Sequence, residues 1–115
     1  MGSKLFAGAH IEATEATATL VSDAATLNKA AGRITTEELT TAAEGTETFT
    51  ITNDQVTANS VVLAVISDYA GAGTPVLSQV NPGAGSFVVT VVNSSASTAL
   101  DDPLVFDFAV IAEIS

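Results

Sequence analysis

From residue 32 onward the sequence alternates between strand-length apolar runs and clusters of Gly, Pro, Asn and Ser. The run 46–53 is the clearest, because Phe49 and Ile51 would face one way and the threonines between them the other, with the period of two typical of a half-buried strand. The runs with strand character are 33–36, 46–53, 60–67, 76–80, 86–93 and 103–113. Turn-type clusters separate them at spacings of roughly 10–15 residues, and no helical pattern of the kind a βαβ fold needs lies between them. The sequence therefore predicts an all-β fold, an antiparallel β-sandwich or jelly roll.

Three of these runs carry information about burial. The run 60–67 is apolar on both faces, which predicts a central strand covered on both sides, and 86–93 has the same pattern. In 103–113 the apolar face alternates with a second face that acids interrupt. The predicted core face of this last run consists of Leu104, Phe106, Phe108 and Val110.

The segment 11–31 is ambiguous. Ser22 could cap a short helix that Gly32 ends, but Ala25 stands where the Glu or Gln of a capping box would be. The alternative, which we favour, is two short strands at 17–21 and 26–29. We therefore expect an extended N-terminal arm over residues 1–25 and a single β-sandwich domain over residues 26–115.

The charge of the chain is large and unevenly placed. The net charge is −10, yet 47% of the residues are hydrophobic, which predicts a folded chain that buries further apolar surface against copies of itself or against a partner. All three basic residues lie in the first 33 positions, whereas residues 34–115 carry ten acids and no base. Such a surface repels phosphate backbones, so we expect no nucleic-acid partner. No run approaches the ~18 apolar residues of a membrane span, and the first residues lack the apolar stretch of a signal peptide, so we expect a soluble protein with no membrane partner.

No recognisable active site is present in the sequence. There is no cysteine, and the one histidine, His10, precedes the strand-rich part of the chain. The acid pairs Glu37-Glu38 and Asp101-Asp102 lack the spacing of a catalytic pair or a calcium loop, and the second pair suits a turn. The glycine pairs at 71–73 and 83–85 have neither the lysine of a phosphate loop nor a following helix. We therefore expect no enzymatic activity, no cofactor and no metal.

Several stretches resemble small virion proteins of tailed bacteriophages. The stretches that carry the resemblance are 26–45, 49–54, 60–63, 85–93 and 104–111, so that it spans roughly residues 26–112. The chain resembles capsid decoration (cement) proteins and the related head-fibre proteins, which have a jelly-roll-like β fold. The resemblance implies a homotrimer on the outer capsid surface of the virion, with the major capsid protein as its partner and an N-terminal arm that grips the shell.

Under this interpretation Lys4, Lys29 and Arg33 are candidate contacts to an acidic capsid, and the alternative is that they are ordinary solvated residues. A second hypothesis is a tail-fibre or adhesin-type module that recognises a host surface glycan. It predicts exposed aromatic side chains, which a composition with 5% aromatics disfavours. A small hydrolase is the least supported, because one histidine cannot supply a nucleophile, base and orienting group.

Overall fold

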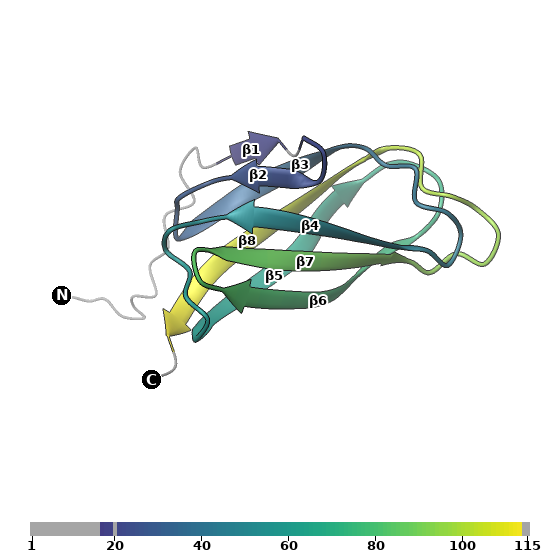
Figure 1. Ribbon diagram of the computed structural model, residues 1–115. Helices are drawn as coiled ribbons and strands as arrows, with labels where there is room; N and C mark the ends of the chain where they lie inside the picture. The colour runs from purple at the N-terminus through teal and green to yellow at the C-terminus, as the bar shows by residue number, and fades with distance from the viewer. Residues whose placement is uncertain (1–16, 20, 114–115) are drawn as a thin grey trace.

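The computed structural model describes residues 17–19 and 21–113, and in this part of the chain it contains eight β-strands and no helix (Figure 1). The strands are β1 (Thr17–Thr19), β2 (Ala24–Thr26), β3 (Ala31–Glu38), β4 (Thr46–Thr52), β5 (Ser60–Tyr69), β6 (Pro75–Gly83), β7 (Ser86–Asn93) and β8 (Pro103–Glu113). The described residues accordingly include no helix long and apolar enough to cross a bilayer.

Two four-stranded sheets pack face to face, with strand orders β1-β3-β8-β5 and β2-β4-β7-β6. The chain passes from one sheet to the other at every connection except the β6–β7 hairpin. The pairings among β3 to β8 are antiparallel, as expected, whereas the short strands β1 and β2 pair parallel to β3 and β4. The all-β sandwich is confirmed, and the two sheets are mixed rather than purely antiparallel.

The described part of the ambiguous segment, residues 17–19 and 21–31, contains two short strands and no helix, and the second strand is Ala24–Thr26 rather than 26–29. β1 and β2 are joined by Ser22 and Asp23, whose φ angles of 52° and 64° suit the two central positions of a type I′ hairpin turn. Val21 and Ala24 exchange two backbone hydrogen bonds of 2.9 and 3.1 Å across this turn. Residues 17–19 and 21–25, which we expected in the arm, are therefore attached to the two sheets, and the rest of the expected arm lies outside the described residues.

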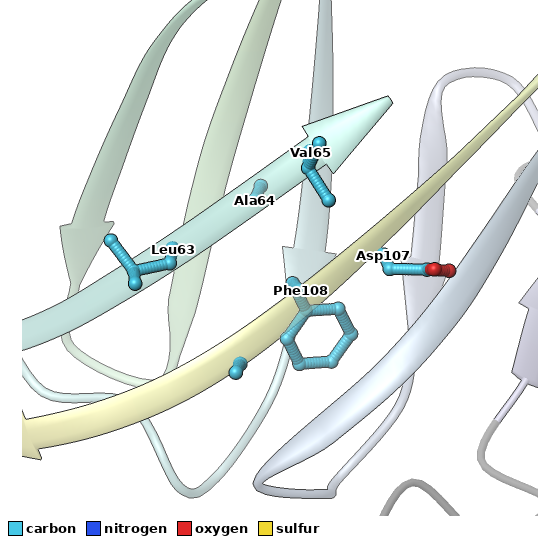
Figure 2. A pocket seen from close by; sticks show the side chains of 6 residues that line it. Leu63, Ala64, Val65, Asp107 and Phe108 are labelled. Carbon is cyan, nitrogen blue, oxygen red and sulfur yellow. The ribbon is translucent and has the colours of Figure 1, made fainter. Parts of the chain in front are cut away.

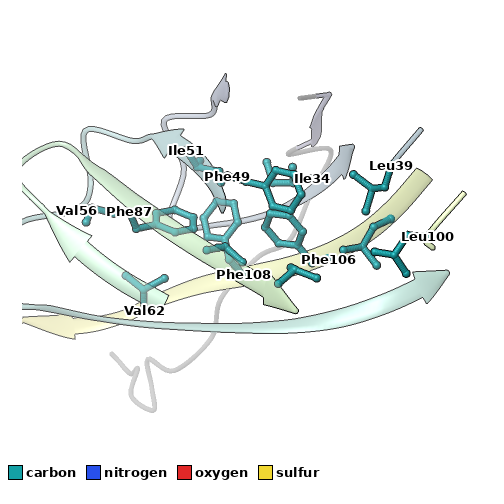
Figure 3. Close-up of a cluster of buried hydrophobic side chains, with 13 residues drawn as sticks. Ile34, Leu39, Phe49, Ile51, Val56, Val62, Phe87, Leu100, Phe106 and Phe108 are labelled. Carbon is teal, nitrogen blue, oxygen red and sulfur yellow. The ribbon is translucent and has the colours of Figure 1, made fainter. Parts of the chain in front are cut away.

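The core lies between the sheets and is built around four phenylalanines (Figure 3). Phe49 of β4 stacks on Phe106 of β8 with ring centroids 6.3 Å apart, and Phe87 of β7 meets Phe108 of β8 at 4.9 Å. These contacts cross from one sheet to the other, so the predicted inward faces of β4 and β8 are confirmed. Burying four aromatic rings in this way supplies much of the hydrophobic stabilisation of so small a domain.

One burial prediction was wrong. β5 was expected to be covered on both faces, but it is the last strand of its sheet, and Leu63 and Val65 on its outer face are 59% and 61% exposed. The physical reason is that a two-layer sandwich covers only the inner face of each sheet. An apolar residue on the outer face of such a sheet stays in contact with water.

A buried asparagine at each end of the sandwich forms hydrogen bonds with the backbone of the loops there. Asn53 follows β4 and donates from its side-chain nitrogen to the carbonyl oxygen of Lys29 at 2.7 Å. Asn93 ends β7 and accepts hydrogen bonds from the backbone nitrogens of Thr74 and Ser95, each at 3.1 Å. Both asparagine side chains are fully buried and connect loops that are distant in sequence.

Candidate functional site

The feature most suited to binding is an apolar area on the outer face of the sheet β1-β3-β8-β5. Among the described residues, five large hydrophobic side chains are exposed, and three of them (Leu63, Val65 and Ile111) lie on β5 and β8. Leu63 is paired with Ala109 and Val65 with Asp107, so these side chains share one face. We call the area formed by Leu63, Val65, Asp107, Ala109 and Ile111 the β5–β8 face.

The β5–β8 face is hollowed beside β5. A depression of about 440 Å³ is lined by residues 63–65 of β5 and 107–109 of β8. Figure 2 shows Leu63 and Val65 on β5 beside Asp107 on β8. Apart from the Asp107 carboxylate, the side chains that line it are hydrocarbon, so it suits an apolar side chain of a partner rather than a polar small molecule.

The one acid of this face is neutralised within the chain. Arg33 on β3 lies directly across from Asp107 on β8 and donates from Nε to Oδ1 at 2.8 Å and from a terminal nitrogen to Oδ2 at 3.0 Å. The hydrogen bond and charge of Asp107, with a smaller contribution from Asp68, raise the pKa of the Arg33 guanidinium. The β5–β8 face is thus electrically neutral on a chain whose net charge is −10.

The three predicted capsid contacts have different surroundings. Arg33 is partly exposed but is held by Asp107 in a bidentate pair. Lys29 is exposed in the connection between β2 and β3, where its carbonyl oxygen accepts the hydrogen bond from Asn53. Lys4 lies outside the described residues. The structure therefore places Lys29 in a loop and Arg33 on a sheet face.

The acids and aromatics considered for chemistry have structural partners. The Asp101 carboxylate accepts a hydrogen bond from the Ala72 nitrogen at 2.7 Å, which ties it to a loop 29 residues away. The Tyr69 hydroxyl donates to the Ala72 carbonyl and accepts from the Asp101 nitrogen at 3.0 Å. No cluster of three or more potential metal-ligating side chains occurs within residues 17–19 and 21–113, and His10 lies outside them.

A glycan site of the usual kind needs an exposed aromatic ring. In the described part of the chain, the four phenylalanines are in the core and Tyr69 is half-buried with its hydroxyl already engaged. The described residues consequently offer no aromatic platform on which a sugar ring could stack.

Asp23 in the β1–β2 turn lies close to a second acid, Glu47 of β4. Partial desolvation, together with the hydrogen bond and negative charge of Glu47, raises the pKa of Asp23 from 3.8 to about 6. Glu47 also accepts a hydrogen bond from the Thr41 hydroxyl at 3.0 Å, while the Asp23 carbonyl accepts one from the Thr50 nitrogen at 3.0 Å. The turn is therefore held close to β4 despite two facing carboxylates.

We expect Asp23→Asn to stabilise the protein near pH 8 and to have little effect near pH 4. Because the folded pKa of Asp23 lies above its unfolded value, the folded state binds the proton more tightly, and stability is lost as pH rises through about 6. Asparagine is neutral at both pH values and also tolerates the positive φ of this position. The gain near pH 8 should stay below about 1 kcal/mol, since the site is partly exposed.

Urea denaturation at the two pH values measures this difference. Asp54→Asn is the matched control, because it removes the same charge from an exposed turn, and its effect should differ less between the two pH values than that of Asp23→Asn. An Asp23→Asn effect independent of pH would contradict a raised pKa of Asp23 in the folded protein.

The binding surface was not identified from the sequence, although a signal for it was present. Leu63 and Val65 were assigned to a covered strand, and Ile111 to the acid-interrupted face of the last strand. A strand that is apolar on both faces, in a sandwich with no helices to cover it, indicates an exposed apolar face. No protein-family model, curated protein or solved structure matches this chain.

Proposed function

We propose that this chain is a structural virion protein, a capsid decoration protein that binds the outer capsid surface as an oligomer and stabilises the shell. The observation that carries the proposal is the β5–β8 face, an exposed apolar area kept neutral by the Arg33–Asp107 pair on an otherwise acidic chain. The resemblance of residues 26–112 to decoration proteins supports it. The binding partners are the major capsid protein and further copies of the chain.

The proposed mechanism is stabilisation by preferential binding. A protein that binds the assembled lattice but not the free subunits adds its binding free energy to the stability of the shell. Burial of Leu63, Val65 and Ile111 would provide a hydrophobic contribution of roughly 25 cal/mol for each Å² removed from water. Because Arg33 pairs with Asp107, this contact does not bury an unpaired carboxylate against the capsid. The exposed Lys29 is a further candidate contact.

The test uses heads of a phage whose gene for this chain has been deleted. We expect heads that lack the protein to release their genome at a lower temperature than wild-type heads. Purified protein should bind these heads and restore the wild-type temperature. Ile111→Lys should weaken binding by at least about tenfold, because a half-exposed isoleucine contributes on the order of 1–2 kcal/mol when buried.

Val76→Lys is the matched control. Val76 is 45% exposed, close to the 49% of Ile111, but belongs to β6 in the other sheet. If the heads bind the Ile111→Lys and Val76→Lys variants equally well, the β5–β8 face does not contact the capsid. Heads that neither bind the protein nor lose stability on deletion of its gene would refute the decoration function.

A further inference from the structure

The two sheets present four edge strands, and three of them carry features that prevent pairing with another chain. β1 and β2 have three residues each, too short for an extended ladder. β6 contains Pro75 and Pro82, which have no N–H to donate. Three edges of the sandwich are therefore protected against addition of a strand.

β5, the fourth edge, has none of these features. It is ten residues long and contains no proline and no lysine, and its one charged residue, Asp68, is next to the last. In the part of the chain that the structure describes, residues 61–68 make no backbone hydrogen bonds beyond those within their own sheet. A strand of this length at an edge leaves a row of N–H and C=O groups able to accept another strand.

The regular part of β5 is symmetric about Ala64. Its pairing with β8 shifts register between Val61 and Val62 and again between Ile66 and Asp68. Residues 62–66 thus form an uninterrupted run of five apolar residues whose middle is Ala64. Two copies of such a run that use the same free edge can pair antiparallel about a two-fold axis, which makes the contact the same for both copies.

We propose that β5 pairs antiparallel with β5 of a second copy about a two-fold axis at Ala64, which joins the two β1-β3-β8-β5 sheets into one continuous sheet. In this register Leu63 lies opposite Val65 of the second copy on the outer face, and Val62 lies opposite Ile66 of the second copy on the inner face. Opposed side chains in an antiparallel pair have Cβ atoms about 4.5–5.5 Å apart, close enough for the exposed Leu63 and Val65 to cover each other.

The charges nearest the proposed contact do not lie opposite each other. The run 62–66 is uncharged, and the proposed register places Asp68 opposite Ser60 of the second copy. The two Asp68 residues would then be about 27 Å apart along the strands, well beyond the screening length of about 10 Å in 0.1 M salt. The remaining acids repel only at long range, so added salt should raise the fraction of dimer.

This contact forms between isolated chains, so its test does not need capsids, although Leu63 and Val65 also belong to the β5–β8 face. The experiment is the absolute mass of the full chain by light scattering after size-exclusion chromatography, from micromolar to millimolar concentration. We expect a mass of two 11.5 kDa chains at the higher concentrations. Leu63→Lys/Val65→Lys and Leu63→Glu/Val65→Glu each place like charges opposite each other twice, and should raise the dimer dissociation constant by roughly tenfold or more.

The charge-swapped variant tests the register. In Leu63→Lys/Val65→Glu each lysine lies opposite a glutamate of the second copy, so this variant should dimerise more tightly than either like-charge variant. Both positions are exposed in the single chain, so all three variants should fold, and circular dichroism checks this. Val76→Lys, on the proline-protected edge, should leave the dimer unchanged.

Three results would overturn the proposal. The first is a wild-type mass of one chain at every concentration. The second is a mass of three chains, because a two-fold contact between β5 strands joins only two. The third is a wild-type dimer that all three double variants weaken equally, since the contact would then depend on apolar area and not on this strand register.

Discussion

Replacing Asn93 with aspartate is expected to lower the free energy of unfolding by about 3–5 kcal/mol near neutral pH. The fully buried Asn93 side chain donates from Nδ2 to three backbone carbonyl oxygens at 2.8–3.3 Å. These oxygens belong to Thr41, Ala42 and Thr98. A carboxylate in the same place would direct a negatively charged oxygen at three acceptors with no water to screen them. Urea denaturation near pH 7 measures the loss.

The loss should become smaller on acidification. Burial would raise the pKa of the new carboxyl group above its unfolded value, so protonation below that pKa restores a donor and part of the stability. Asn59→Asp adds the same charge at an exposed position and should change stability by less than about 0.5 kcal/mol. A small Asn93→Asp effect, or one that grows as the pH falls, would show that the Asn93 hydrogen bonds do not hold these loops.

Replacing Phe106 with alanine is expected to cost about 3–5 kcal/mol and to lower the melting temperature by more than about 10 °C. Phe106 is fully buried in β8, between Ile34 of β3 and Ile66 of β5, and stacks on Phe49 of the opposite sheet. Truncation leaves a cavity where the two sheets meet, and the surrounding backbone cannot close it because both neighbouring strands are fixed in register. Chemical and thermal denaturation measure both quantities.

A double-mutant cycle tests whether the Phe49–Phe106 contact is responsible. Phe49→Leu and Phe106→Leu should each cost less than the alanine change, and their combination should show a coupling of about 0.5–1.5 kcal/mol, since the two rings stack across the sheets. Strictly additive effects would contradict a direct contribution from this pair. Val76→Ala, at an exposed position, should have only a small effect.

The candidate site was only partly predictable. Arg33 was singled out as a base in an acidic chain, but its partner Asp107 is 74 residues away, and only the pairing of β3 with β8 brings the two together. Asn93 was assigned to a strand end, and nothing in its sequence neighbourhood indicates the loops that its side chain connects. Contacts of this kind depend on which strands become neighbours, and the residue pattern along a single sequence does not show which strands these are.

The sequence by itself determined the strands and their inward faces. The period-two alternation in β4 and β8, and the turn residues between the strands, depend on local backbone preferences and on which side chains avoid water, and these act over a few residues. The tertiary structure alone decided the strand order, the parallel pairing of β1 and β2, and the place of β5 at an edge. The physical reason is that an apolar strand is equally compatible with the middle or the edge of a sheet until its neighbours are known. Leu63 and Val65 are exposed because the sandwich covers only the inner face of their sheet, and the edge position of β5 leaves one side of the same strand without a neighbouring strand.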